Sequence, residues 1–270
     1  MPTDHERTVG LAGDSTLLDG YTPLPRTYDE LYRGDGTPRD EVADLVSELD
    51  QLGRLEFMTR QKLAEGALFR GGVTFSVYSD SRGQEKIFPF DLIPRVIPAS
   101  AWDPIERGLV QRVTALNMFL TDLYDGQRII EEGVIPKEVV FGTTGYLEEL
   151  HGMRPKEGVF VNIAGIDLIR GATGEFLVLE DNLRTPSGVS YVLENRVVMK
   201  RVFPGVFRRS RVRPVVGYPS RLADTLMTVS PSDPAESRIV VLTPGPFNSA
   251  YFEHSFLARQ MGCDLVQGND

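Results

Sequence analysis

Two short apolar runs on either side of a glycine-containing turn constrain this sequence most strongly. The runs are Ile166–Ile169 and Phe176–Leu179, and the segment between them begins with RGATG at residues 170–174. Apolar runs joined by a turn of this composition are typical of a β-hairpin. We therefore predict a tight pair of strands, with Asp167 inside the first and Glu180 and Asn182 at the end of the second.

Three polar side chains of this hairpin are predicted to converge. Glu180 and Asn182 are two residues apart, so on a strand they project to the same face, and Asp167 can lie beside Glu180 across the hairpin. Two carboxylates and one amide oxygen suit Mg²⁺ held jointly with nucleotide phosphates. The plainer interpretation is a solvated hairpin end, since Asp and Glu are mostly exposed. Against it, the three polar residues 180–182 directly follow the run FLVL, where a strand disfavours them unless a site needs them.

Longer strings of sequence resemble a known family. Asp167, then Glu180-x-Asn182, then Arg184 and the loop 185–190 (TPSGVS) resemble the metal-binding segment of ATP-grasp ligases. The strings LEDNLRTPSGVSYVLENR (179–196) and LTPGPFNSAYFEHSFLARQMG (242–262) are similar to the circularly permuted ATP-grasp family related to glutathionylspermidine synthase. The resemblance runs from about Tyr28 to the last residue.

The resemblance implies a fold and a reaction. The fold class expected is α/β (α+β), with an ATP-grasp-like subdomain at 39–215 that carries the metal-binding hairpin. Residues 216–270 would then be the start of a βαβ (pre-ATP-grasp-like) domain, so that this chain is the N-terminal portion of a longer protein. The implied reaction is ATP-dependent ligation of a carboxylate to an amine through an acyl phosphate, with ATP and Mg²⁺ as cofactors. The substrates would be small molecules or peptides.

The resemblance also suggests roles for individual residues. Asp167, Glu180 and Asn182 would bind Mg²⁺, and the Ser187-Gly188 loop would orient the acyl phosphate. The arginines implied in nucleotide binding or phosphoryl transfer are Arg184, Arg95 and Arg196; the residues implied in substrate binding are Asn248, Ser249, Tyr251, Glu253 and His254. Their plainer roles are surface charge, a simple turn and helix capping. Two features depart from the family: Gly165 stands where many members carry an arginine, and the nucleotide-binding lysines are expected past residue 270.

The rest of the sequence predicts mainly helices. Residues 1–38, rich in Gly, Pro, Asp and Thr, predict a flexible or loosely packed arm. Apolar residues at three- and four-residue steps predict an amphipathic helix from Arg39 to about residue 65, broken near Gly53. We also expect a strand pair at 73–80 and 84–97 with a turn at 81–83, followed by a helix capped by Asp103 with Pro104 in its first turn. On that helix, loop-anchoring or solvated roles are expected for Gln111, Arg112 and Asn117. Further along we expect a helix at 189–203, a boundary between two units at 209–237, and a strand–loop–helix–strand unit after it.

Composition narrows the remaining classes. A net charge of −9 argues against a nucleic-acid-binding surface, which needs a basic footprint. The single cysteine, Cys263, predicts a structural residue, no intrachain disulfide and a reducing compartment. No apolar run approaches the length of about 20 residues that a membrane helix needs, and no leader is visible, so we expect a cytoplasmic protein. Two alternatives remain: an inactive ATP-grasp-like module that acts through a protein partner, and a metal-dependent hydrolase using Asp167 and Glu180 without ATP.

Overall fold

The computed structural model describes residues 16–76, 85–87, 89–184, 186–233 and 235–270. Its helices are α1 (Ala43–Arg70), α2 (Ala99–Tyr124), α3 (Arg128–Glu131), α4 (Lys137–Phe141), α5 (Val189–Val202), α6 (Pro204–Arg209), α7 (Tyr218–Val229) and α8 (Tyr251–Met261), with short 3-10 turns at Asp40–Val42, Glu148–Leu150 and Lys156–Gly158. Its strands are β1 (Thr74–Ser76), β2 (Glu85–Ile87), β3 (Gly165–Arg170), β4 (Phe176–Asn182), β5 (Val240–Leu242) and β6 (Asp264–Val266). This mixture of helices and small sheets confirms the α/β class.

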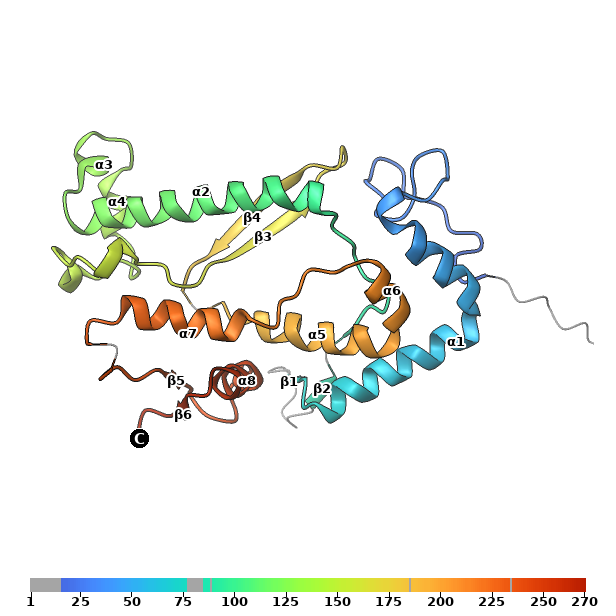
Figure 1. The fold of residues 1–270 in the computed structure, drawn as a ribbon. Helices are drawn as coiled ribbons and strands as arrows, with labels where there is room; N and C mark the ends of the chain where they lie inside the picture. Colours follow the sequence, from blue (N-terminus) through green and yellow to red (C-terminus); the bar gives the residue numbers. More distant parts are fainter. Residues whose placement is uncertain (1–15, 77–84, 88, 185, 234) are drawn as a thin grey trace, which may run out of the picture.

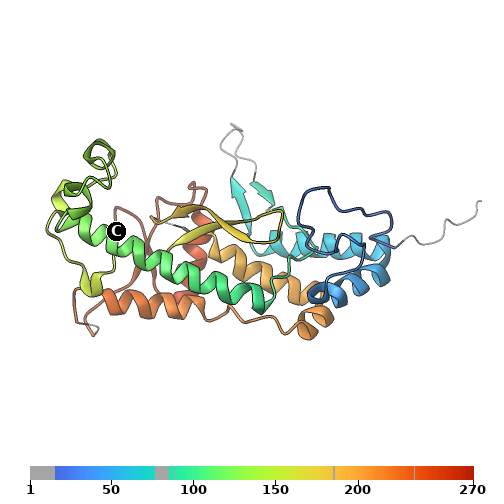
Figure 2. The same ribbon diagram turned by 90° about the horizontal axis from the view of Figure 1, so that it is seen from above.

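The longer elements form two layers, and α8 with β5 and β6 lies beyond the second of them (Figure 1). The long helix α2 and the hairpin β3–β4 lie side by side in one layer, and α1, α5, α6 and α7 form the other (Figures 1 and 2). Among the described residues the sheets are two-stranded: β1–β2 and β3–β4 are antiparallel, and β5–β6 is parallel. The β3–β4 hairpin confirms the strand pair predicted from residues 166–179.

The hydrophobic core lies between α1, α5 and α6. Apolar side chains at three- and four-residue steps on α1, among them Leu45 and Leu49, are buried against Val198 and Phe203. Helix α1 is kinked at Gly53, whose φ of 68° is not helical. It ends before Gly71. The predicted amphipathic helix and its break at Gly53 are therefore confirmed.

The start predicted for helix α2 is wrong. The helix begins at Ala99, after an extended Pro98 whose carbonyl accepts the N–H groups of Ala101 and Trp102. Pro104 therefore sits inside the helix, where it lacks an N–H for the carbonyl of Ser100. Asp103 forms an ion pair with Arg213 and does not cap the helix. Pro98 and Pro104 each indicate the start of a helix, and the helix begins directly after Pro98.

Two other segments also differ from their expected form. The strand predicted for 84–97 is described only at Glu85–Ile87, and residues 89–98 are irregular, since Pro89 and Pro94 cannot donate to a ladder. The turn expected at 81–83 lies outside the described residues. The boundary predicted at 209–237 contains helix α7, which accommodates Pro219 in its first turn. Downstream, β5, α8 and parallel β6 form the expected strand–loop–helix–strand unit; a division of the chain at residue 215 stays a prediction.

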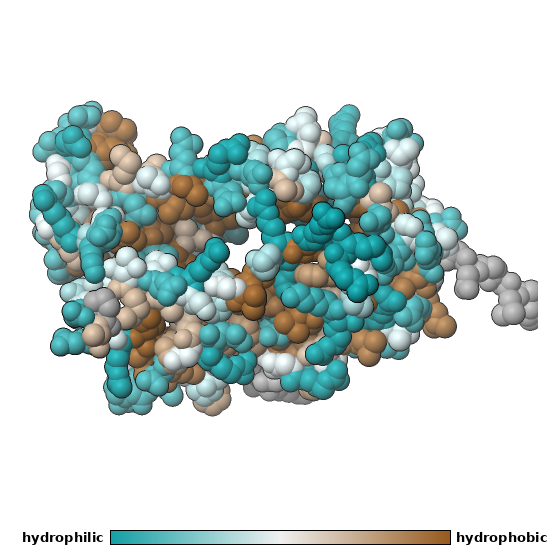
Figure 3. Space-filling model, in the orientation of Figure 1, coloured by the Kyte–Doolittle hydropathy of each residue, from teal (hydrophilic) through white to brown (hydrophobic). Residues whose placement is uncertain are grey.

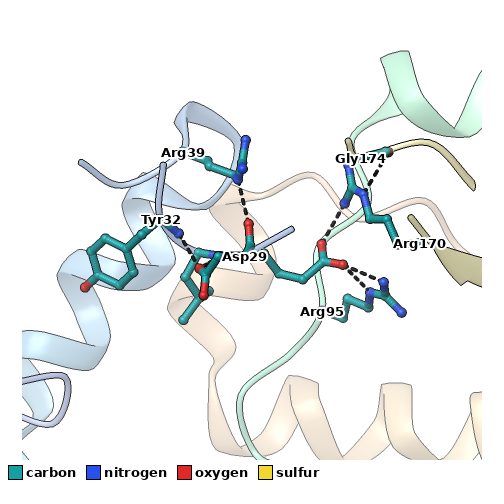
Figure 4. A network of polar contacts seen from close by, with 8 residues as sticks. Asp29, Tyr32, Arg39, Arg95, Arg170 and Gly174 are labelled. Atoms are coloured by element: carbon teal, nitrogen blue, oxygen red, sulfur yellow. Dashed lines mark hydrogen bonds and ion pairs between the residues drawn. The ribbon is translucent and has the colours of Figure 1, made fainter. Parts of the chain in front are cut away.

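Residues 16–38 differ from the loosely packed arm that their composition suggests. Leu17, Leu18, Leu31 and Tyr32 pack against the core. The Glu30 carboxylate binds two guanidinium groups, with Nη1 of Arg170 2.6 Å from Oε2 and Nε of Arg95 2.8 Å from Oε1 (Figure 4). This segment therefore joins the hairpin β3–β4 to the chain before α2.

No helix in the part of the chain that the structure describes combines the length and the apolar character needed to cross a membrane.

Candidate functional site

The structure brings Asp167, Glu180 and Asn182 together at the open end of the hairpin. Asp167 of β3 pairs with Glu180 of β4 across the ladder. The side-chain amide of Asn182 lies 3.1 Å from Oδ2 of Asp167 and 3.2 Å from Oε1 of Glu180. All three side chains are exposed. We call these residues the oxygen-donor trio; their convergence is as the sequence predicts.

The orientation of the Asn182 amide follows from its neighbours. Its NH₂ group faces two carboxylates, which can only accept hydrogen bonds when ionised. A half-turn about the last side-chain bond exchanges the NH₂ group for the oxygen, at little cost in shape. With a cation between the carboxylates, the amide oxygen of Asn182 is the favoured ligand, so the trio supplies three hard oxygen donors. Without a cation, the NH₂ group of Asn182 donates two hydrogen bonds to the carboxylates.

A bulge separates the trio from the rest of the hairpin. The register shifts between Asp167 and Leu168, because Leu168 faces Val178 and Leu179 is the extra residue. Bulges increase the local twist and re-aim side chains, and they occur often beside active sites. The trio thus lies on a strand end whose direction differs from that of the strands near the turn.

Helix α2 holds the opposite face of the hairpin end. Asp181 lies between Glu180 and Asn182 and so projects to the other side. There its carboxylate accepts from Nε and Nη2 of Arg112 at 2.7 and 2.6 Å. This fork-like pair fixes the strand end against α2 while leaving the trio exposed.

The Arg112 guanidinium hydrogen-bonded to Asp181 lowers the pKa of that carboxyl below its ordinary value. The contact therefore adds stability above the unfolded-state pKa of about 3.9 and loses it as the pH falls through the folded-state value. We expect Arg112→Gln to raise the pKa of Asp181 in an NMR titration of the side-chain carboxyls. Asp122 is the control, since it lies on the same helix and its pKa is lowered mainly by the backbone N–H of Ile129. An unchanged Asp181 pKa in the variant would show that the pair does not form in solution.

The loop after β4 packs back on the start of β3. A Cβ built on Gly165 would lie 2.7 Å from Cβ of Pro186, so any larger residue there would displace the loop. Gly165 also faces Asn182 across the ladder. Gly165 therefore gives the loop its close approach to the trio.

The same loop connects the trio to helix α8. The Ser187 hydroxyl lies 3.4 Å from Oε1 of Glu253, and its carbonyl accepts from Ser190 Oγ at 3.1 Å. Gly188 precedes the first turn of α5, whose N–H groups face the loop. The structure therefore brings Ser187, five residues after Asn182 in sequence, into contact with Glu253 of α8.

The other residues expected to bind substrate serve the local fold. Oδ1 of Asn248 accepts the N–H of Ala250 at 2.9 Å, which closes the turn before α8. Nδ1 of His254 is 3.0 Å from Oγ1 of Thr243, and that hydroxyl also accepts the N–H of Gly245. Ser249 lies half-buried in the same turn, and Tyr251 begins α8. These contacts anchor turns and loops, while the N-cap of α8 is Ala250, which no side chain caps, so the capping expected of Asn248 and Ser249 is wrong. Binding roles for these residues stay a prediction.

The predicted phosphate-binding arginines are spread over the molecule. Arg184 is exposed two residues after Asn182. Arg95 binds Glu30 beside the hairpin turn, as does Arg170, whose side chain is 9% exposed (Figure 4). Nη1 of Arg196 donates to the carbonyl of Arg213, and burial lowers the pKa of this guanidinium. Of these residues, Arg184 is the one that the chain places next to the trio.

Sequence reasoning did not assign three contacts of this region. They are the ion pair from Arg112 to Asp181, the packing of Pro186 on Gly165, and the placement of Tyr191 beside Glu253. Asn117 anchors a loop as expected, since its Oδ1 accepts the N–H groups of Phe160 and Val161. The position of Arg112 on the exposed face of a long helix was a signal for this ion pair, but its partner Asp181 is distant in sequence.

An open hollow lies on the other side of the hairpin. Its volume is about 490 Å³, and α2 and the start of β3 line it with Leu109, Val110, Val113, Thr114, Ala164 and Ile166. Figure 3 shows the molecular surface hollowed between the α2 layer and the layer of α5 and α7. The lining has no charged group, so it does not suit phosphate.

The oxygen-donor trio fits a magnesium ion that is shared with a nucleotide. No group of three or more His, Cys, Asp or Glu side chains in the described residues is arranged to hold a metal alone. Two carboxylates and an amide leave coordination positions for phosphate and water, which is the environment Mg²⁺ favours. The donor set therefore suits a shared cation and does not suit a closed structural metal site.

The fold is thus α/β, and its hairpin presents hard oxygen donors to solvent. The chain belongs to the circularly permuted ATP-grasp family, whose type 2 model matches residues 94–270. This confirms the family resemblance.

Relatives match along nearly the whole chain. An uncharacterized protein of Synechocystis is 49% identical over 253 residues, which cover 94% of this chain and 52% of the relative. An uncharacterized protein of Mycobacterium tuberculosis is 46% identical over 269 residues, covering 100% and 47%. A protein of Frankia alni named "Putative glutamate–cysteine ligase 2-3" is 37% identical over 254 residues, covering 93% and 29%. The chain spans about half the length of the first two relatives.

Proposed function

We propose that this chain supplies the metal-binding hairpin of an ATP-dependent carboxylate–amine ligase. The observation that carries the proposal is the convergence of Asp167, Glu180 and Asn182 in a member of the permuted ATP-grasp family. The ligase name of the Frankia relative supports the same reaction class. Since Cys263 is the single cysteine, we also propose the reducing cytoplasm as its location.

The proposed reaction has two steps. A carboxylate oxygen of the acid attacks the γ-phosphorus of ATP, the bond to the β-phosphate oxygen breaks, and ADP leaves. The amine loses one proton to become the nucleophile, its nitrogen attacks the acyl carbon, phosphate leaves with its bridging oxygen, and the nitrogen loses one further proton to give the amide. ATP is converted to ADP and phosphate, and no oxidant or reductant is needed.

The residues of the site divide this work. Asp167, Glu180 and Asn182 would hold Mg²⁺, which when bound neutralises charge on the phosphate oxygens. Arg184 is exposed beside the trio and is suited to pair with a phosphoryl group. The Ser187-Gly188 loop leads into α5, and the positive end of that helix's dipole favours an anion. The loop therefore suits the acyl phosphate.

We expect Mn²⁺ with ATP, used as a paramagnetic substitute for magnesium, to broaden the side-chain amide signals of Asn182. The cation would bind within the trio, and broadening falls steeply with distance from it. The double variant Asp167→Ala/Glu180→Ala should lose this broadening, because it removes both carboxylates. The measurement is a heteronuclear NMR titration of the full chain, together with calorimetry of Mg-ATP binding.

The matched control for the double variant is Glu175→Ala. Glu175 is an exposed carboxylate on the same hairpin, at the turn end, and the lost charge should leave the broadening at Asn182 intact. Equal broadening in wild type and double variant would contradict the metal assignment. It would leave the inactive interaction module as the better description.

A further inference from the structure

The geometry points to Glu253 as the group that binds the ammonium of the amine substrate. Glu253 lies in the first turn of α8 and is 7% exposed. Its Oε1 accepts from the Ser187 hydroxyl, while Oε2 is buried and has no hydrogen-bond partner among the described residues. This inference rests on the proposed function, since it assigns the binding site of one of the two substrates.

A buried carboxylate oxygen without a partner is costly. Buried polar atoms are nearly always hydrogen-bonded, and buried charges are usually paired with an opposite charge. No ion pair between described residues includes Glu253. The N-terminus of α8 favours a negative charge, but it supplies only about half an elementary charge. Among the described residues, the site therefore keeps a negative balance that a cation would neutralise.

The neighbour of Glu253 on α5 does not supply that cation. Burial and the adjacent Glu253 carboxylate raise the pKa of the Tyr191 phenol well above its ordinary value. The phenol therefore stays neutral, so Tyr191 lies beside Glu253 as a polar group and contributes no positive charge. Tyr191 and the Ser187 hydroxyl leave the charge of Glu253 unbalanced.

The location of Glu253 matches the second step of the proposed reaction. Pro186 packs on Gly165 at the start of β3, and the next residue, Ser187, contacts Glu253. One short loop thus lies between the oxygen-donor trio and the buried carboxylate. An ammonium bound at Glu253 would lie on the α8 side of the loop that is proposed to hold the acyl phosphate.

The polar side chains beside the Glu253 carboxylate indicate a primary ammonium. Such a group has three N–H donors, and the Glu253 carboxylate, the Ser187 hydroxyl and the Tyr191 phenol each have acceptor capacity. A quaternary ammonium has no N–H donor and would leave Oε2 without a hydrogen bond. We therefore infer that the amine substrate enters as a primary ammonium.

The test uses n-propylammonium chloride against n-propanol, its neutral analogue, with the full chain and without ATP. We expect the ammonium to raise the melting temperature and to shift the backbone NMR signals of Ser187 and Tyr191, and the alcohol to do neither at equal ionic strength. In Glu253→Gln the ammonium effects should be lost. The unliganded variant should melt higher, by roughly 2–4 °C, because an unpaired buried charge is removed.

Matched variants separate a binding role from a structural one. Glu149→Gln removes an exposed carboxylate and should retain the full ammonium response. Glu253→Asp keeps the charge and should retain part of it, which decides the matter if Glu253→Gln does not fold. Equal responses to amine and alcohol, or an unchanged response in Glu253→Gln, overturn the inference. Because ATP and metal are absent, this result is independent of the Mn-ATP broadening at Asn182, so a failure of this inference can be distinguished from a failure of the proposed function.

Discussion

Phe203→Ala is expected to lower the free energy of unfolding by about 3–5 kcal/mol. The ring is 1% exposed and lies where α5 ends and α6 begins, packed against α1. Its loss leaves a cavity bounded by three helices, and the Arg60 guanidinium, 5.1 Å from the ring centroid, loses its aromatic partner. Domains are stable by about 5–15 kcal/mol, so this is a large share of the total. Urea unfolding followed by circular dichroism measures it.

The control for that variant is Phe247→Ala. Phe247 is 93% exposed in the loop before α8, so removing its ring should change the unfolding free energy by no more than about 0.5 kcal/mol. Comparable losses in the two variants would mean that Phe203 is not at the centre of the core.

The hairpin and its trio could be predicted because their information is local. A turn of RGATG composition between two apolar runs determines that the two runs pair. Counted back from the turn, an unbroken register would place Asp167 opposite Leu179, and the bulge at Leu179 shifts the pairing so that Asp167 faces Glu180. Asn182 then shares a face with Glu180 by the two-residue period of a strand. Helix α1 and its kink at Gly53 were predictable for the same reason, since spacing and a glycine act within a few residues.

The contacts that position the hairpin could not be predicted from one sequence. Arg112 and Asp181 are 69 residues apart, and Glu30 and Arg170 are 140 apart. Nothing in the local pattern around Glu30 selects Arg170 over any other exposed arginine, because ion pairs depend on tertiary packing. The same reason explains why residues 16–38 were expected to be loose: their composition disfavours regular structure, but their side chains find partners across the fold.

The unexpected start of α2 shows how two local signals compete. Asp103-Pro104 is a strong helix-start pattern, and Pro98 is another. Starting at Ala99 sacrifices one hydrogen bond at Pro104 but adds more than a turn of helix. The choice between the two depends on whether residues 99–103 gain contacts, and Asp103 does so by pairing with Arg213.

Gly174→Ala is expected to destabilise the protein by about 2–4 kcal/mol. Gly174 has a φ of 96°, which side-chain-bearing residues rarely adopt, and an added Cβ would lie 2.6 Å from Cε2 of Tyr28. The Tyr28 ring cannot move away freely, since the guanidinium groups of Arg170 and Arg39 stack on it at 3.8 and 3.9 Å. Both the backbone strain and the clash therefore fall on the contact between residues 28–30 and the hairpin turn. Urea unfolding of the variant measures the loss.

Two variants separate strain from clash. Gly36→Ala introduces a side chain at a φ of 79° with open space around it, so it should cost only the backbone term of about 1–2 kcal/mol. In the double variant Tyr28→Ala/Gly174→Ala the clash is absent, and the loss should be smaller than the sum of the two single losses. If Gly174→Ala costs no more than Gly36→Ala, the contact with Tyr28 is too loose to hold the turn.

The same variant tests whether the hairpin acts as one unit. Strand β4 connects the turn near Gly174 to Asn182 at the open end of the hairpin. The bulge at Leu179 lies between the turn and the open end. If the strands move together, displacing the turn will tilt the trio, and the side-chain amide signals of Asn182 will shift in Gly174→Ala but not in Gly36→Ala. If the bulge acts as a hinge, those signals will stay in place, and the trio is positioned by Arg112 and Pro186 alone. Either result identifies the contacts on which a ligand at the trio depends. Shifted Asn182 signals would mean that contacts at both ends of the hairpin position the trio, and unchanged signals would mean that only the contacts at its open end do so.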